Sequence, residues 1–325
     1  MKRRIVSLLV VALAIPSAFA IQANPVPAVQ AGPNLFYTVP NANHAFAVSV
    51  QGGIGYADGM AKEFVYNNKD GSKVSQLDWD IQNVLMGGGT LSLRFLDRLT
   101  LNGSAWFAIS EGDGSMDDYD WMAVGYDEWS DHSWHDVDVT DGTSYDINIA
   151  WDLLQYKGMA LRIFGGYSED DWQWDDHFRG ALYSSDNWHD TSIVGDGEKS
   201  ISYEQQIRLP YLGAAIDFTM DALSCSIYGR FSQWGEAEDW DTHFARQTDF
   251  YETFDDVEMY AFGARIRYAF SCAFYLEAAA DWQSVDAGKG DAYSFSFEDG
   301  DGYAKDSAGL ENNLLTGTLA LGYTF

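Results

Sequence analysis

The stretch LSLRFLDRLTLNGSAWF, residues 91–107, contains two alternating segments joined by a tight turn. Leu91, Leu93 and Phe95 alternate with polar residues before the turn at 96–98, and a similar alternation resumes after it. Because successive side chains of a strand point to opposite faces, this period of two predicts a pair of half-buried antiparallel strands.

The same unit recurs along the chain and predicts ten strands. These are 44–66, 73–95, 99–109, 143–153, 159–173, 200–216, 222–234, 257–270, 273–285 and 311–325. A loop at 67–72 links the first two strands. The later connections alternate between short ones and long ones: 96–98, 154–158, 217–221 and 271–272 are short, and 110–142, 174–199, 235–256 and 286–310 are long. Short periplasmic turns that alternate with long extracellular loops are typical of outer-membrane barrels.

Other architectures fit this pattern less well. After the N-terminus, no segment has the roughly eighteen consecutive apolar residues that a membrane helix needs. A soluble sandwich would not place charges such as Arg265, Arg267 and Glu277 on the second face of its strands, whereas a polar lumen accepts them. The sequence therefore predicts an all-β fold: a ten-stranded antiparallel transmembrane β-barrel with long extracellular loops and short periplasmic turns.

Both ends of the chain agree with export. Residues 1–20 have the charged start, apolar run and small-residue cleavage site of a secretory signal peptide. Residues 21–43 show no periodic pattern and are expected to form an N-terminal arm before a single barrel domain, 44–325. The last strand ends in Phe325, which resembles the signal read by the barrel assembly machinery, the partner expected during biogenesis.

The chain is strongly acidic, with a formal net charge of −30. Such a field repels nucleic acid, which is not expected as a partner, and attracts cations and basic peptides. The acids gather in the predicted extracellular loops, since 110–142 holds eleven acids and no Lys or Arg. Two interpretations stay open at this point: a functional acidic mouth, or a rim that is merely solvated or bridged by cations.

Two acidic clusters have a spacing that chemistry can use. Asp118 and Asp120 lie two apart on an extended segment, so they share a face and their repulsion raises one pKa. Asp241 and His243 have the same spacing, so the carboxylate can orient the imidazole and support its charged form. Together they indicate a His–carboxylate site that activates water without a serine or cysteine nucleophile.

The remaining histidines and the cysteines give weaker signals. His132 and His135 have an unspecific spacing for a metal, so they are expected to be solvated loop histidines, and no metal site is predicted. Cys225 and Cys272 are hypothesised to form a disulfide near the periplasmic rim, since they lie near the same end of two adjacent antiparallel strands in an oxidising compartment. The alternative is that Cys225 faces lipid.

Short motifs stand in one order along the chain: KVSQLDW at 73–79, DYDWM at 118–122, LPYLG at 209–213, WGEA at 234–237 followed by DTH at 241–243, and GYTF at 322–325. They resemble the motifs of the omptin family of outer-membrane endopeptidases, from about residue 46 to the C-terminus. The resemblance implies an aspartic-type enzyme of the Gram-negative outer membrane whose active site faces the exterior. Its substrates would be basic peptides or proteins, its surroundings outer-membrane lipid, and no cofactor is implied.

The resemblance also implies roles for single residues. Asp118 and Asp120 match the aspartate couple of the family, and Asp241 and His243 match its Asp–His dyad. His243 and Asp118 would activate the attacking water, while Asp241 would orient His243. The pocket residues are matched in the same way: Glu63 and Asp239 to the acids that receive the basic side chain before the scissile bond, and Asp131 to an acid on the other side of that bond.

One departure concerns lipopolysaccharide, which family members bind on the barrel wall through a set that includes two arginines. Tyr167 and Glu169 match part of that set, but Asp171 and Gln206 stand at the arginine positions. We therefore expect weak binding of lipopolysaccharide as an activator. The alternative functions are a non-catalytic adhesin or receptor and a cation-selective pore. The retained Asp/Asp and Asp/His sets favour the enzyme, and a ten-stranded barrel has little open lumen.

Overall fold

The computed structural model describes residues 46–325 except 97, 124–126 and 298–299. The predicted signal peptide, 1–20, and the predicted arm, 21–43, lie outside the described residues. Within the described part of the chain, no helix has the length and apolar character needed to cross a membrane.

The described residues form twelve β-strands, all in one sheet. Their bounds are β1 Phe46–Tyr66, β2 Lys73–Phe95, β3 Leu99–Ala108, β4 Gly112–Asp120, β5 Asp131–Tyr156, β6 Met159–Tyr183, β7 Thr191–Val194, β8 Ile201–Met220, β9 Leu223–His243, β10 Thr248–Ala269, β11 Phe274–Ser296 and β12 Gly300–Thr324. Every pairing is antiparallel, as expected for strands joined by hairpins.

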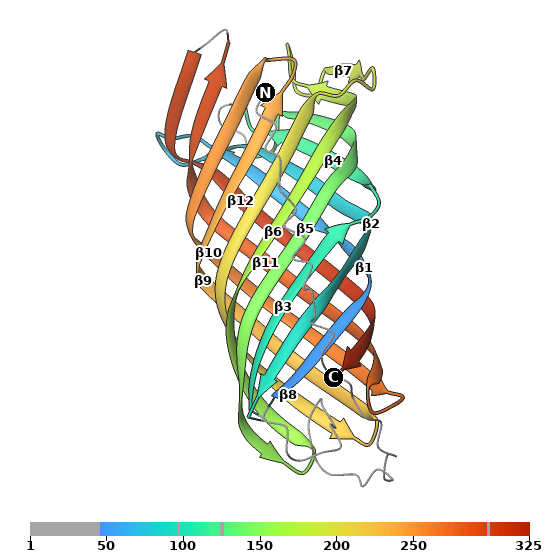
Figure 1. Ribbon diagram of the computed structural model, residues 1–325. Coiled ribbons are helices and arrows are strands. Elements are labelled where there is room, and N and C mark those ends of the chain that lie inside the picture. Colours follow the sequence, from blue (N-terminus) through green and yellow to red (C-terminus); the bar gives the residue numbers. More distant parts are fainter. Residues whose placement is uncertain (1–45, 97, 124–126, 298–299) are drawn as a thin grey trace. The chain divides into compact units, whose positions relative to one another are not determined.

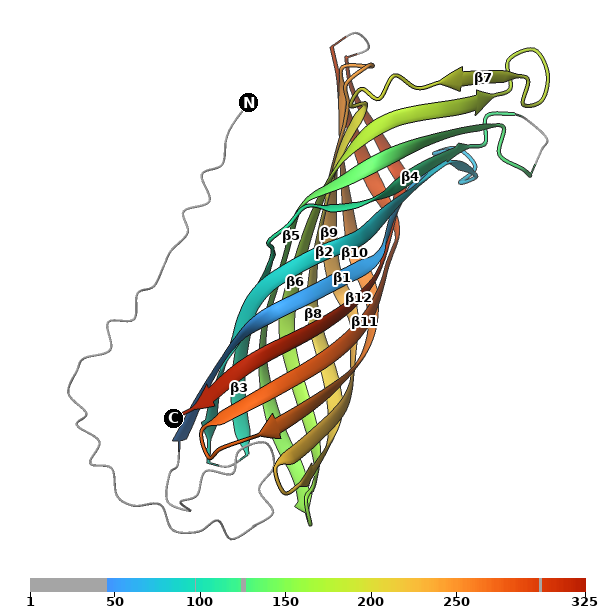
Figure 2. The ribbon, with the colours of Figure 1, turned by 90° about the vertical axis from the view of Figure 1, so that its right-hand side faces the viewer.

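Eleven of these strands, all except β7, form the ten strand paths of a closed ring. Each strand pairs with its sequence neighbours, and β12 returns to β1, where Ser49 lies opposite Thr324 (Figure 2). β3 and β4 occupy consecutive parts of one strand path, because both pair with β2 on one side and β5 on the other. β7 is a short addition that pairs with β6 (Figure 1). The predicted ten-stranded barrel is thereby confirmed, and closure leaves no open sheet edge for lipid to meet.

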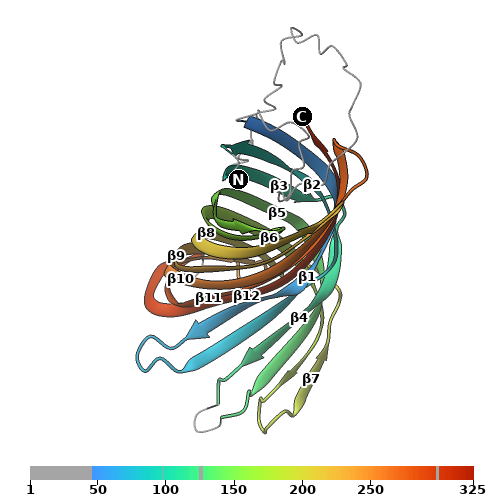
Figure 3. The ribbon, with the colours of Figure 1, turned by 90° about the horizontal axis from the view of Figure 1, so that it is seen from below.

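The ring has two halves, defined by the connections at their ends. The membrane-spanning half carries the turns that follow β2, β5, β8 and β10, together with the C-terminus. Its outward face is apolar, and the exposed side chains include Val50, Ile54, Leu91, Ile147, Ile149, Trp151, Ile227, Phe262, Ile266, Leu319 and Leu321. An outward apolar band is the surface that a bilayer requires. The outer half carries the hairpin ends at β4 and β7, away from the C-terminus (Figure 3).

In the outer half, the prediction of long loops is wrong for most of their residues. Most of 110–142, 174–199, 235–256 and 286–310 is strand, so the barrel strands run on well past the membrane-spanning half. The alternation there is inverted: on β5, Val137 and Val139 are buried inward while Asp136 and Asp138 are exposed. Acids on the outward face belong to strands surrounded by water, and their abundance is what suggested loops.

β-Bulges lie between the two halves. The pairing register shifts between Ala57 and Gly59 on β1, between Val139 and Asp141 on β5, and between Phe254 and Val257 on β10. Each shift inserts a residue and turns the opposite set of side chains toward the interior. The bulges thus let one strand carry an apolar outer face in lipid and an apolar inner face above it.

The disulfide hypothesis is wrong for this structure, since Cys225 and Cys272 are both free. Cys225 lies on β9 opposite Ile266 of β10 and Phe218 of β8. It belongs to the outward-facing set of the membrane-spanning half, together with Leu223 and Ile227. Cys225 therefore packs among lipid-facing residues.

Candidate active site

The acids singled out by their spacing meet in the outer half, on two walls of the ring. One wall is formed by β1, β2 and β4, where Glu63, Leu77 and Asp118 lie on one row of register partners. The other wall is formed by β8, β9 and β10, where Tyr203, Asp241 and Phe250 form a row. We call the space between these walls the cleft.

His243 and Asp241 form a close pair on β9. His243 Nε2 lies 2.6 Å from Asp241 Oδ2, which agrees with two side chains that share one face of a strand. Asp241 is only 3% exposed, and its second oxygen has no hydrogen-bond partner. The His243 and Phe250 rings pack in a T-shaped arrangement with their centroids 5.4 Å apart. The carboxylate thus holds the imidazole in one orientation.

Asp118 and Asp120 face the pair from β4. The Ser75 hydroxyl donates to Asp118 at 3.0 Å. Burial raises the pKa of Asp118, while the hydrogen bond from Ser75 and the nearby charges of His135 and His243 lower it. The influence of His243 places its ring within electrostatic range of Asp118 across the cleft.

Asp120 is the member of the couple that can hold a proton near neutrality. Burial, followed by the charge of Asp118, raises the pKa of Asp120 to about 7. Burial disfavours the charged form most, and the like charge of Asp118 adds to that effect. The couple and the dyad therefore bring a carboxylate, a protonatable carboxyl and an imidazole to one place, and these groups can move protons to and from a substrate.

Glu63 and Asp239 lie deeper in the same cleft. They are 4% and 1% exposed. Burial raises the pKa of Glu63, and the charges of Asp241, Asp239 and Asp118 raise it further. Glu63 therefore lies within electrostatic range of acids on both walls. Burial also raises the pKa of Asp239 to about 8.

A series of three hydrogen bonds between buried polar side chains ends on the Asp239 carboxylate. Asn312 donates to Gln205 at 2.7 Å, Gln205 donates to Tyr203 at 3.2 Å, and the Tyr203 hydroxyl donates to Asp239 at 3.1 Å. Each donor points toward the carboxylate, which favours its charged form. Glu63 Oε2, by contrast, is buried with no hydrogen-bond partner. A buried cation entering from outside would satisfy both acids.

Asp131 sits at the edge of the site. It lies opposite Asp120 in the β4–β5 pairing. Its oxygens accept hydrogen bonds from the Ser130 hydroxyl at 2.7 Å and the Ser184 backbone at 2.9 Å. Asp131 is therefore held in place beside the couple, and it is more exposed than the acids of the deep pocket.

The prediction of solvated loop histidines is wrong for His135 and incomplete for His132. His135 is buried on β5 and forms a second His–carboxylate pair, with its Nδ1 2.5 Å from Asp176 of β6. His132 lies 2.8 Å from Asp117 and stacks on Tyr119. Both pairs need cross-strand register, which the spacing of His132 and His135 alone does not contain. No cluster able to hold a metal ion occurs in the described part of the chain.

A further acid, Glu252, was also missed. It lies on β10 opposite Asp239 and is 4% exposed. The signal was present in the sequence, since Glu252 alternates with the half-buried Tyr251 and Thr253 and shares its face with the buried Phe254. Its position beside Asp239 required the register of β9 against β10.

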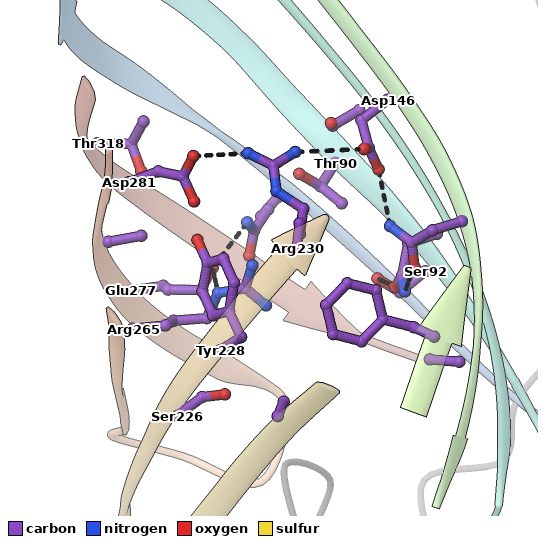
Figure 4. Close-up of a pocket in the computed structure, with 18 of the residues that line it drawn as sticks. Thr90, Ser92, Asp146, Ser226, Tyr228, Arg230, Arg265, Glu277, Asp281 and Thr318 are labelled. Carbon is purple, nitrogen blue, oxygen red and sulfur yellow. Dashed lines mark hydrogen bonds and ion pairs between the residues drawn. The ribbon is translucent and has the colours of Figure 1, made fainter. Parts of the chain in front are cut away.

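The lumen of the membrane-spanning half contains a separate cavity of about 270 Å³. Figure 4 shows Arg230 reaching Asp281 on one side and Asp146 on the other, at 2.6 and 3.9 Å. The guanidinium and carboxylate groups named here, all of which line the cavity, form ion pairs with one another. This cavity shares no lining residue with the cleft.

The barrel wall differs from the cleft and from the lumen. Tyr167, Glu169 and Asp171 alternate with the inward-facing Ser168 on β6, so they face outward. Gln206 lies opposite Asp171 on β8 and donates to Glu169 at 3.0 Å. The set expected to bind lipopolysaccharide is thus gathered on the wall, with a carboxylate and an amide at its two arginine positions.

Comparisons with known proteins agree with this fold. Residues 44–325 match the model of the Omptin family. The chain is 32% identical to the plasminogen activator of Yersinia pestis over 88% of this chain and 92% of that protein. It is 27% identical to Protease 7 of Escherichia coli K12 over 84% and 88% of the two chains. The solved structure of the outer membrane protease OmpT from Escherichia coli has the same fold, with a TM-score of 0.82, 24% identity and coverage of 87% and 99%.

Proposed function

The chain belongs to the omptin family of outer-membrane proteases, and from this premise we propose that its cleft hydrolyses peptides next to basic residues. As a family member it is an endopeptidase of the Gram-negative outer membrane and acts on protein substrates. The proposal adds which residues carry the reaction and which side chain is selected.

The observation that carries the proposal is the His243–Asp241 pair, 2.6 Å apart, facing the Asp118–Asp120 couple. With Nε2 held by Asp241, the other ring nitrogen is left to accept a proton from water. Asp118 would align that water, which attacks the scissile carbonyl as the proton moves to His243. Asp120, whose pKa is raised to about 7, lets the couple hold the proton that the leaving amine needs.

Specificity in this proposal comes from acids without counter-ions. Glu63 and Asp239 are buried and can both accept hydrogen bonds from a cationic side chain placed before the scissile bond. Asp131 would receive a residue on the other side of that bond. A neutral side chain would leave these carboxylates unpaired, which disfavours it.

The test is cleavage of a fluorogenic Arg-Arg peptide by refolded protein, with and without lipopolysaccharide. We expect cleavage by the wild-type protein and a loss of about a hundredfold or more in Asp118→Asn, since the water then loses its charged partner. Asp113→Asn, an exposed aspartate on the same strand, is the matched control and should retain activity. No cleavage under either condition would overturn the proposal.

A further inference from the structure

The pocket around Asp239 contains a third carboxylate, Glu252. It comes from β10, directly opposite Asp239 in the β9–β10 pairing. The two carboxyl groups are within hydrogen-bonding reach of each other. The Glu252 residue is only 4% exposed, and its Oε2 has no hydrogen-bond partner in the described structure.

Among the described residues, no cation acts on the pKa values of Glu63, Asp239 and Glu252. Burial, followed by the charges of Asp239, Glu63 and Asp241, raises the pKa of Glu252. Buried carboxylates without counter-ions are unfavourable, so hydrophobic or neutral residues would suit the fold better at these positions. An unpartnered oxygen on Glu63, another on Glu252 and a third on Asp241 remain to be satisfied by something that enters the cleft.

The chemistry of those oxygens favours one kind of cation. A guanidinium presents five N–H donors in a rigid planar fork and is weakly hydrated. An ammonium presents three donors at a single point and holds its water more strongly. Carboxylates that come from β9 and β10 on one wall and from β1 on the other match the spread of the guanidinium better than the compact ammonium.

We propose that Glu252 is a specificity-determining residue of the cleft, and that together with Glu63 and Asp239 it selects arginine over lysine before the scissile bond. This inference rests on the proposed function, because it assigns a further residue to the same pocket. The competing explanation is a structural one, in which a neutral Glu252 only hydrogen bonds to Asp239. The amide of Gln would replace such a group without changing the choice of substrate.

The experiment compares kcat/KM for two peptides that differ only in Arg or Lys before the scissile bond. For Glu252→Gln we expect a loss of about tenfold or more on the Arg peptide, mainly through KM, and a smaller loss on the Lys peptide. The Arg/Lys ratio therefore falls. Glu252→Asp keeps the charge and should recover part of that ratio. Glu258→Gln, an exposed glutamate on the same strand, is the control and should match the wild type.

A second readout does not depend on turnover. Calorimetry with butylguanidine and butylamine measures binding of the two cations to folded wild-type protein and to Glu252→Gln, with folding checked by gel mobility before and after heating. Weaker butylguanidine binding to the variant, with butylamine affected less, supports the inference. If the wild type cleaves basic peptides while Glu252→Gln keeps both the Arg/Lys ratio and butylguanidine affinity, the inference is wrong and the proposed function stands. If the wild type neither cleaves basic peptides nor binds butylguanidine, both are wrong.

Discussion

The lumen of the membrane-spanning half and the cleft above it are formed by the same barrel strands. They differ in whether their buried charged groups have counter-ions. In the lumen, Asp152 is fully buried and accepts hydrogen bonds from Arg94 at 2.8 Å and from Arg162 at 2.7 Å. Arg230 lies between two carboxylates in the same manner (Figure 4). These lumenal charges thus have counter-ions within the protein.

Three acids of the cleft have no such partner among the described residues. Glu63, Asp239 and Glu252 are as deeply buried as the lumenal acids, but the groups that act on their pKa values are burial, other acids and neutral donors. Paired charges hold strands together, whereas unpaired acids raise the free energy of the empty protein and lower that of a complex with a cation. Pairing therefore separates the lumenal charges of this barrel from the acids of the specificity pocket.

The largest expected effect comes from breaking the lumenal network. Asp152→Asn removes the charge that two guanidinium groups share, so we expect the free energy of unfolding to fall by about 3 to 5 kcal/mol. The folded fraction should keep its kcat, because the cleft is untouched. Urea unfolding of the barrel in detergent measures the first quantity. Asp221→Asn, in the turn between β8 and β9, is the control, and equal stability of the two variants would contradict the structural role of Asp152.

The next effect concerns catalysis. His243→Ala should lower kcat by at least about a hundredfold, the usual contribution of a general base, without unfolding the barrel. His177→Ala is a matched control, because His177 forms a pair with Asp138 at 3.2 Å on the exposed face of β6 and β5. Turnover by His243→Ala near the level of His177→Ala would remove His243 from the mechanism.

A smaller effect is the pH dependence that unpaired acids impose on stability. The pKa of Asp239 is about 8 in the folded protein, whereas an unfolded aspartate titrates near 4. Between these values the folded state keeps a proton that the unfolded state has lost, so the free energy of unfolding falls as pH rises through this window. Asp239→Asn should flatten that slope and be more stable than the wild type at pH 9 by about 1 to 3 kcal/mol. Unfolding curves at pH 4, 6, 8 and 9 measure this, and identical slopes would argue against a protonated Asp239.

The smallest expected effect is that of lipopolysaccharide. Asp171 repels a lipid phosphate and Gln206 offers only a neutral hydrogen bond, so removal of lipopolysaccharide should change kcat/KM little. Arg208 is the nearby cation, but its guanidinium is engaged with Glu238 at 3.1 Å. The double substitution Asp171→Arg and Gln206→Arg should create a stronger dependence. An assay in chelator excludes bridging by divalent cations, and full dependence of the wild type under that condition would contradict this reasoning.

The membrane-spanning half could be predicted from the sequence because lipid imposes a simple pattern. Ile147, Ile149 and Trp151 face outward and alternate with lumenal residues, so the period of two is evident. Above the membrane, water replaces lipid outside while the interior stays packed, and the apolar side of each strand changes. At the bulges, the set of side chains that faces the interior changes from one alternate set to the other. Strands predicted from one continuous alternation therefore ended near the bulges.

Site residues that are neighbours on one strand could be predicted from the sequence. Neighbours that lie on two different strands could not. Asp241 and His243 are two residues apart, and their shared face follows from strand geometry alone. Glu252 beside Asp239, and Asp176 beside His135, are neighbours only through the register of adjacent strands. A single sequence does not contain that register, so these partners needed the structure.

The unpaired acids of the cleft are expected to receive a cationic side chain of the substrate. The most direct measurement is kcat/KM of the wild-type protein on two peptides that differ only in arginine or citrulline, its neutral isostere, before the scissile bond. Citrulline keeps the length and planarity of arginine and removes the charge, so it leaves the pocket carboxylates without a counter-ion. We expect the arginine peptide to be favoured by about a hundredfold or more. Equal kcat/KM values for the two peptides would contradict the account.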